Sequence, residues 1–110
     1  MSSLRFPIPQ GTLDMLILQI LSLEPMHGYG IAQRLHQISR TVVKVNQGSL
    51  YPALHRLEQK GWLRGEWKQS ENNRRARFYR LTPEGRKQLA RELREYQLVQ
   101  GAIVRVIEAL

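Results

Sequence analysis

Most positions between Thr12 and Leu23 are apolar, so a helix over this stretch would carry hydrophobic side chains on almost every side. Thr12 is a good N-cap residue, Asp14 suits the first turn, and Pro25 ends the pattern. A helix in a small domain cannot bury all of its faces against one core. We therefore expect a second subunit to cover part of this helix, in preference to a wholly internal explanation.

Two further stretches with helical spacing follow, separated by a β-branched connection at 40–45. The first runs from about Gly30 to Ser39. The second begins near Ser49, after capping residues that start at Asn46. It ends at Gly61, because glycine readily adopts the left-handed conformation that terminates a helix. One face of this second helix is apolar, with Leu50, Ala53, Leu54 and Leu57. Its opposite side carries Tyr51, Pro52, His55, Arg56 and Gln59. A helix, a turn and a helix with outward polar groups predict a helix-turn-helix.

Beyond Gly61 the pattern changes to that of two strands, at 62–69 and 76–81, both rich in aromatic residues. The polar turn 70–75 lies between them, so we predict a β-hairpin, which is called a wing in winged-helix DNA-binding proteins. Basic residues gather toward the turn, where they could meet a phosphate backbone. They are Lys68, Arg74, Arg75 and Arg77.

The last predicted helix opens with the cap Thr82 and with Pro83 at its first position. Residues then recur at alternating steps of four and three, which is a heptad seam. The seam consists of Leu89, Leu93, Tyr96, Gln100, Ile103, Ile107 and Leu110. A helix of about 25 residues is about 37 Å long, so its end should project beyond so small a domain. We expect a second copy of the chain to cover the projecting part.

Composition and charge point to one folded domain with a polyanionic partner. The chain has 110 residues, 42% hydrophobic and 24% charged, with a net charge of +8 and a pI near 10.6. Most of the excess positive charge lies between Arg56 and Arg94. The longest apolar run is too short to span a bilayer, no signal peptide is recognised, and cysteine is absent. We therefore expect a cytoplasmic protein without a membrane partner.

Enzyme chemistry has little support in this sequence. The three histidines, His27, His36 and His55, are far apart and have no cysteine or acidic partners at metal-ligand spacing. Asp14 is the only aspartate, and no serine or carboxylate is spaced from a histidine along the chain as in a recognised catalytic motif. We predict no catalytic residue, metal or cofactor. Two alternatives to DNA binding stay open: a winged-helix adaptor that binds protein, and an RNA-binding protein.

Three segments resemble the PadR family of bacterial transcriptional regulators. They are Gly28-Tyr29-Gly30-Ile31, the stretch from Gly48 through Leu50-Tyr51-Pro52-Ala53-Leu54 to Glu58, and Tyr79-Arg80-Leu81-Thr82-Pro83-Glu84-Gly85. The resemblance implies a mainly α, α+β fold: a winged helix-turn-helix with a long C-terminal dimerisation helix. It also implies a homodimer, usually a repressor of a nearby operon, whose first and last helices make the dimer contact.

The chain is similar to the short branch of that family. Some short members bind flat aromatic drugs at the dimer centre, against a tryptophan of the last helix. Here Tyr96 is the only aromatic residue of that helix. A small aromatic effector would therefore meet Tyr96 and Gln100.

These observations divide the chain into a flexible arm at 1–11, a winged helix-turn-helix at 12–81 and a dimerisation helix at 82–110. We expect Ser49 and Tyr51 to contact phosphates, His55 and Arg56 to enter the major groove, and Lys44 and Gln47 to touch the backbone. The wing cations Lys68, Arg74, Arg75 and Arg77 would hold flanking phosphates or the minor groove. The expected dimer contacts are Leu13, Ile17, Leu93, Tyr96, Ile103, Ile107 and Leu110. The operator should be a palindrome in double-stranded DNA.

Overall fold

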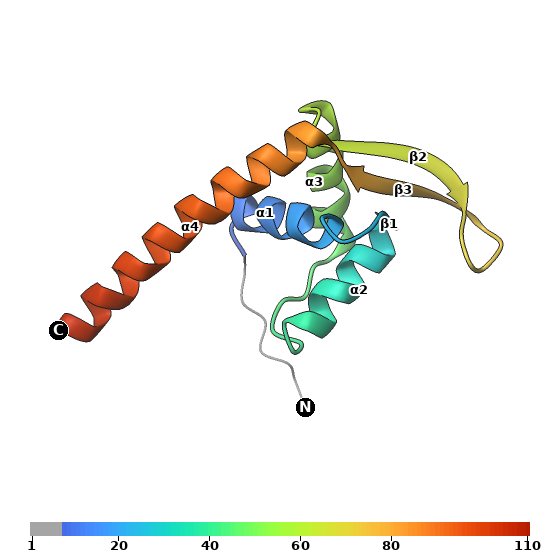
Figure 1. Ribbon diagram of the computed structural model, residues 1–110. Coiled ribbons are helices and arrows are strands. Elements are labelled where there is room, and N and C mark those ends of the chain that lie inside the picture. The colour runs from blue at the N-terminus through green and yellow to red at the C-terminus, as the bar shows by residue number, and fades with distance from the viewer. Residues whose placement is uncertain (1–7) are drawn as a thin grey trace.

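The computed structural model describes residues 8–110, which form four helices and a small sheet (Figure 1). In chain order the elements are α1 (Gln10–Leu21), β1 (Met26–His27), α2 (Gly28–Ile38), α3 (Gln47–Gln59), β2 (Leu63–Gln69), β3 (Arg75–Leu81) and α4 (Pro83–Ala109). This is the predicted winged helix-turn-helix with a long last helix. Residues 1–7 of the expected N-terminal arm lie outside the described part of the chain.

The first two helices begin earlier than the sequence predicted. α1 starts at Gln10, so Thr12 lies inside the helix, and Pro9 takes the N-cap position without a side-chain hydrogen bond. α2 starts at Gly28 because the side chain of His27 caps it, with Nδ1 accepting a hydrogen bond from the Gly30 N–H at 3.1 Å. The sequence prediction took Thr12 as the cap of the first helix and named no cap for the second, whereas the N-cap residues are Pro9 and His27.

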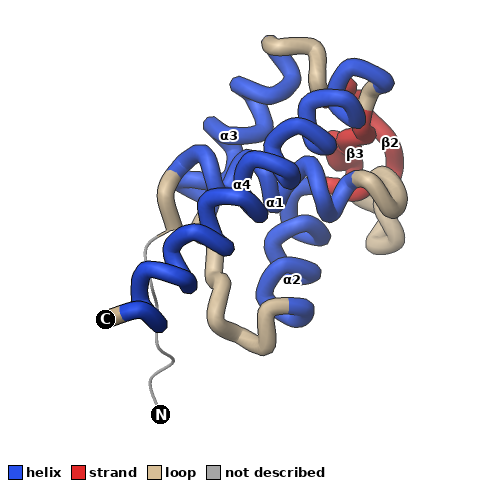
Figure 2. The backbone as a smooth tube through the Cα atoms, turned by 60° about the vertical axis from the view of Figure 1, so that its left-hand side comes forward, coloured by secondary structure: helices blue, strands red, loops and turns tan. Residues whose placement is uncertain are grey.

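The sheet contains a strand that the sequence did not reveal. β1 pairs antiparallel with β3, and the strand order is β1-β3-β2. Figure 2 shows β2 and β3, drawn in red, side by side next to the helices. β1 contains only Met26 and His27, opposite Tyr79 and Phe78. A strand of that length shows no alternation of polar and apolar residues, so only the pairing defines it. β2, β3 and the turn between them form the wing, with a register from Leu63↔Leu81 to Gln69↔Arg75.

α1 lies at the centre of the core and packs against α2, α3, α4 and β3. The exposed fraction of Leu13 is 6% and that of Ile17 is 0% in the single chain. Both had been expected at a dimer contact, and the structure corrects this expectation. The chain itself surrounds α1, so no second subunit is needed to cover these two side chains. On the outer side of α1, Leu16 remains half-buried.

α4 is anchored at its start and extends away from the body at its end (Figure 1). Thr82 caps it by accepting from the Gly85 N–H at 2.9 Å. A Cβ added at Gly85 would lie 2.1 Å from the Trp62 carbonyl oxygen, so only glycine allows this close approach. Leu89 is buried and Leu93 half-buried against the core. Among residues 8–110, no helix is both long and apolar enough to cross a membrane.

Candidate nucleic-acid interface

α3 turns a narrow polar face away from the core. Leu50, Ala53, Leu54 and Leu57 are all buried, as the helical spacing predicted. The opposite side is exposed, and we call it the reading face: Gly48, Tyr51, Pro52, His55 and Gln59. Glycine and proline side chains cannot hydrogen-bond, so base contacts from this face must come from the other residues. Gln59 had not been included among the expected DNA-binding residues, although its amide suits an adenine edge.

The start of α3 presents further polar groups. Asn46 caps the helix, its side-chain oxygen accepting from the Ser49 N–H at 2.9 Å. Lys44, Gln47 and the side chain of Ser49 are exposed around this end. The first turn of a helix offers unpaired N–H groups and the positive end of its dipole, both of which favour phosphate. The positions of these three residues are therefore compatible with the contacts expected from the sequence.

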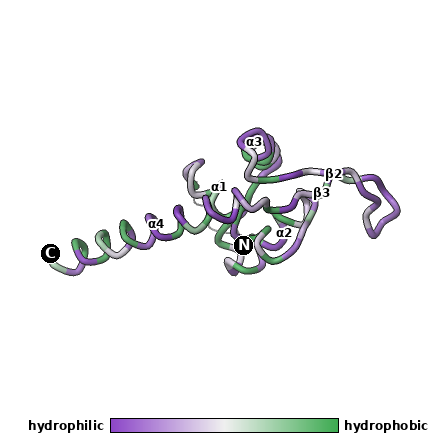
Figure 3. Tube along the Cα trace, turned by 45° about the horizontal axis from the view of Figure 1, so that its top comes forward, coloured by the Kyte–Doolittle hydropathy of each residue, from purple (hydrophilic) through white to green (hydrophobic). Residues whose placement is uncertain are grey.

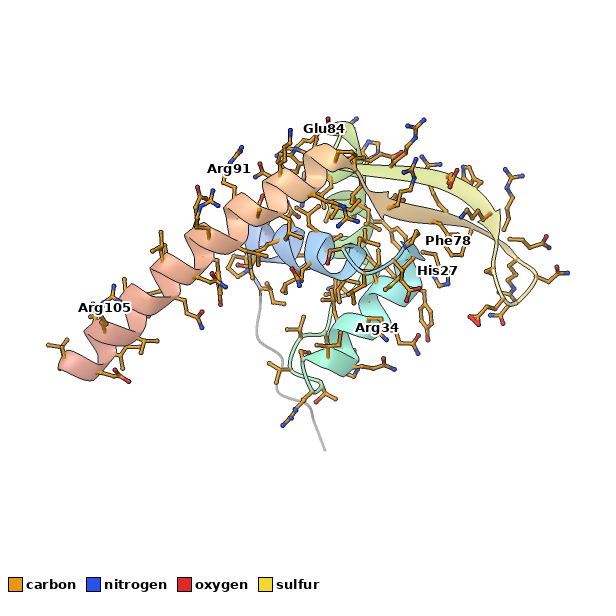
Figure 4. All side chains as sticks on the ribbon, viewed as in Figure 1. His27, Arg34, Phe78, Glu84, Arg91 and Arg105 are labelled. Atoms are coloured by element: carbon orange, nitrogen blue, oxygen red, sulfur yellow. The ribbon has the colours of Figure 1, made fainter. Side chains whose placement is uncertain are left out.

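The wing projects from the body and carries exposed cations near its end (Figure 4). The turn is closed by the Ser70 N–H, which donates to the Arg74 carbonyl oxygen at 2.7 Å. Asn73 adopts the left-handed conformation there, with φ of 58°. Lys68, Arg74 and Arg75 are all exposed. At its base the wing is held by β1, where His27 and Phe78 lie edge to face with ring centroids 5.2 Å apart (Figure 4).

A cleft of about 490 Å³ separates the wing from α2 and α3, and we call it the wing cleft. Its walls are aromatic and cationic: Tyr29 and Tyr51 on the helix side, Trp67, Arg75 and Arg77 on the wing side. Tyr29 is 65% exposed and Trp67 55% exposed. The sequence did not identify these two as interface residues, because the cleft forms only when three separate elements meet.

The ring of Tyr51 lies over Gly28 at the start of α2. A Cβ added at Gly28 would be 2.7 Å from Cε1 of Tyr51 and 2.9 Å from its hydroxyl oxygen. Gly28 therefore provides the space that positions Tyr51 at the edge of the wing cleft. A phenol hydroxyl in this place can donate a hydrogen bond to a phosphate.

The structure changes the interpretation of Arg56. Its Nη2 donates to Oδ1 of Asp14 in α1 at 3.0 Å, and its side chain is only 32% exposed. Burial raises the pKa of Asp14, and the charge of Arg56 partly opposes that rise. Arg56 is thus held at the side of α3, where it links α3 to α1. It does not extend freely from the reading face, as had been expected for a residue that enters the major groove.

Arg77 is likewise held within the fold. Its Nη2 donates to Oε2 of Glu58 in α3 at 2.5 Å, and its side chain is 31% exposed. The hydrogen bond that Arg77 donates to Glu58 is the main cause of the raised pKa of Arg77. The sequence grouped Arg77 with the wing-tip cations because it showed only their proximity along the chain.

The far half of α4 presents a large exposed apolar surface (Figure 3). The expected dimer residues Tyr96, Ile103, Ile107 and Leu110 are 45%, 53%, 68% and 103% exposed, while Leu93 is half-buried against the core. Tyr96 also lines an open hollow of about 360 Å³ between α1 and α4, together with Glu92 and Glu95. Gln100 is exposed but does not line this hollow.

No group of histidine, cysteine, aspartate or glutamate side chains within residues 8–110 is arranged to hold a metal ion. No buried side-chain nitrogen or oxygen in that part of the chain lacks a hydrogen-bond partner.

Comparison with known proteins agrees with this geometry. The sequence profile of the transcriptional regulator PadR-like family matches residues 17–91, from α1 through the wing into α4. The transcriptional regulator Rv3488 of Mycobacterium tuberculosis is 42% identical over 69 residues, which are 63% of this chain and 61% of that protein.

Solved structures with the same fold include a transcriptional regulator from Clostridium thermocellum, with a TM-score of 0.80 at 28% identity over 87% of this chain and 93% of that one. A PadR family transcriptional regulator from Eggerthella lenta has a TM-score of 0.79 at 29% identity, covering 92% of this chain and 86% of its own. The match covers the helix-turn-helix, the wing and the start of α4. This chain therefore belongs to the PadR-like family of transcriptional regulators.

Proposed function

We propose that this PadR-family regulator binds double-stranded DNA in a sequence-specific manner, with the reading face of α3 in a major groove and the wing beside it. The observation that carries the proposal is the wing cleft, because it brings α3, the start of α2 and the cationic side of the wing around one open space. The net charge of +8 favours the same partner.

Each candidate residue has a distinct role in this proposal. His55 and Gln59 read base edges, and Tyr51 and Ser49 bind phosphates beside the groove. Lys44 and Gln47 contact the backbone at the start of α3. Lys68, Arg74 and Arg75 hold flanking phosphates from the wing. Arg56 and Arg77 act through the residues with which they are paired, so they are no longer proposed as direct contacts.

Selection of bound sequences from a random DNA pool, followed by footprinting, tests this function. We expect enrichment of one motif, with a protected major groove and adjacent protected phosphates. Binding that shows no sequence preference, or no dependence on salt, would refute the proposal. Removal of the wing cations separates DNA binding from a protein adaptor, because self-association through α4 should survive that change.

The apolar half of α4 supports the proposal that the regulator is a homodimer. Its exposed seam needs a covering partner, and a second apolar surface is available on the same chain. This is the groove of about 220 Å³ between α1 and α2, lined by Leu16, Leu23, Ile38 and Val43. Leu23 and Ile38 are 66% and 59% exposed. In a two-fold dimer each copy can cover the seam of the other with such surfaces.

The proposed dimer contact differs from the one expected from the sequence, because it uses exposed residues beside the groove between α1 and α2 in place of buried residues of α1. Leu16 of α1 and Leu23 of the turn after it take the place of Leu13 and Ile17, which are already buried. Two reading helices would then lie about 34 Å apart, one turn of DNA, so the selected motif should be a palindrome. Sedimentation of the free protein tests the dimer independently of DNA, and a monomer at micromolar concentration would contradict it.

We further propose that the DNA-bound dimer represses transcription and that an effector releases it. The hollow beside Tyr96 contains two acidic residues, Glu92 and Glu95, so it suits a planar cation. A reporter gene under the selected operator tests repression. Fluorescence titration with ethidium, compared between wild type and Tyr96→Ala, tests the hollow. Equal binding by both proteins would exclude it as the effector site.

A further inference from the structure

Glu58 and Arg77 connect the two DNA-facing elements of the proposed interface. Glu58 lies in the last turn of α3, close to His55 of the reading face. Arg77 lies in β3 opposite Trp67, where the wing leaves the body. Within residues 8–110, their 2.5 Å contact is the one side-chain hydrogen bond between α3 and the strands of the wing. Movement of the wing relative to α3 must therefore break or carry this contact.

The path of the Arg77 side chain is fixed on several sides. A Cβ added at Gly65 would lie 2.7 Å from Nε of Arg77, so the guanidinium crosses the strand at the position where a side chain is missing. The guanidinium carbon is 5.6 Å from the centre of the Trp67 ring and 6.0 Å from that of Tyr79. The Arg77 side chain thus passes over Gly65, lies next to two aromatic rings and ends at the Glu58 carboxylate, so few other rotamers are available to it.

The remaining wing cations are located beyond this contact. Lys68, Arg74 and Arg75 follow Trp67 and precede Arg77 toward the tip, and all three are exposed. Arg75 also lies over the Trp67 ring, at 5.6 Å from its centre. A small rotation of the wing about its base would move these cations by a larger distance at the tip. The angle at the base therefore decides which phosphates they can reach.

We propose that the Glu58–Arg77 pair is a positioning element that fixes the angle of the wing relative to α3, so that the wing cations and His55 engage one DNA site together. The inference rests on the proposed DNA binding, and it gives both residues an indirect role. The direction in which DNA affinity changes when the charge of Glu58 is removed distinguishes a positioning role from simple repulsion. A carboxylate near DNA repels phosphates, so its removal alone should strengthen binding. A positioning role predicts the opposite.

The experiment compares Glu58→Gln, Arg77→Gln and the double variant with wild type on the selected operator. We expect Glu58→Gln to weaken specific binding about five- to tenfold despite the lost negative charge. The double variant should bind about as weakly as Arg77→Gln alone, because both changes remove the same contact. Footprints should lose the wing-side phosphates and keep the α3 half-site. Arg80→Gln is the matched control, since Arg80 is exposed on the same strand and forms none of the described ion pairs.

A second measurement follows the wing without DNA. The chain contains no cysteine, so spin labels at Asn72→Cys in the turn and Gln59→Cys in α3 report one distance. We expect a narrow distance distribution in the parent and a broader one after Glu58→Gln. Unchanged distributions, stronger binding by Glu58→Gln, or fully additive losses would each overturn the inference. If wild type binds no DNA, the proposed function fails as well; if it binds and the Glu58 variant binds equally, only the positioning role fails.

Discussion

Gly28→Ala should reduce DNA binding without destabilising the fold, although the residue carries no chemical group. The three atoms nearest to the added Cβ all belong to Tyr51, at 2.7 to 3.0 Å. Because Tyr51 is 44% exposed, its ring can move into solvent to relieve the clash. A ring displaced in this way would no longer present its hydroxyl at the edge of the wing cleft.

The expected change in stability is small because two effects nearly cancel. Alanine is favoured over glycine in a helix by up to about 1 kcal/mol. Moving Tyr51 out of its preferred rotamer costs about 0.5–1.5 kcal/mol. The free energy of unfolding should therefore change by less than about 1 kcal/mol. A hydrogen bond to a charged group contributes about 1.5–3 kcal/mol, so DNA affinity should fall by about tenfold to a hundredfold.

The assay measures urea unfolding and operator binding for Gly28→Ala, with Tyr51→Phe as the reference for loss of the hydroxyl alone. The two variants should bind DNA with similarly reduced affinity, and Gly28→Ala should lose no further binding when combined with Tyr51→Phe. The reasoning is refuted if Gly28→Ala unfolds several kcal/mol more easily, or if it binds DNA as tightly as wild type.

Three further predictions concern charge and assembly. Arg75→Ala should lower the slope of log affinity against log salt by about one unit, and Arg80→Ala, on the other side of the wing, should change it less. Asp14→Asn should change stability at neutral pH by no more than about 1 kcal/mol, because burial of the carboxylate offsets its attraction to Arg56. Since the folded-state pKa of Asp14 is raised above 3.8, wild-type stability should fall as pH rises through that raised value. The Asn variant should lack this fall in denaturation curves recorded from below pH 3.8 up to neutral pH. Ile107→Glu places a charge on the exposed seam of α4 and should shift sedimentation toward the monomer, which a stable dimer of the variant would contradict.

The elements of the fold could be read largely from local patterns. The buried side of α3 follows directly from helical spacing, and Thr82-Pro83 marks the start of α4 as predicted. The wing follows from two aromatic-rich runs around a polar turn. These signals involve residues within a few positions of one another, where backbone geometry alone relates them. β1 was missed because its pairing partner lies far along the chain.

The candidate site was predicted less completely than the fold. Sequence spacing placed Tyr51 and His55 on the exposed side of α3, where the structure has them. It could not show that Arg56 contacts Asp14 or that Arg77 contacts Glu58, since both pairs join separate elements. An arginine has the same identity whether its guanidinium is free or paired. Only the tertiary neighbours distinguish the two states.

The sequence by itself determined a cationic winged helix-turn-helix with an apolar last helix, because periodicity, capping and net charge are properties of the chain. The tertiary structure decided which apolar side chains are already covered: α1 buries Leu13 and Ile17 within one subunit, whereas the far half of α4 stays open. It also decided which cations are free to meet a phosphate. Both the burial of these side chains and the pairing of the arginines depend on residues distant in sequence that pack together or share a hydrogen bond. Such contacts exist only after the chain has folded.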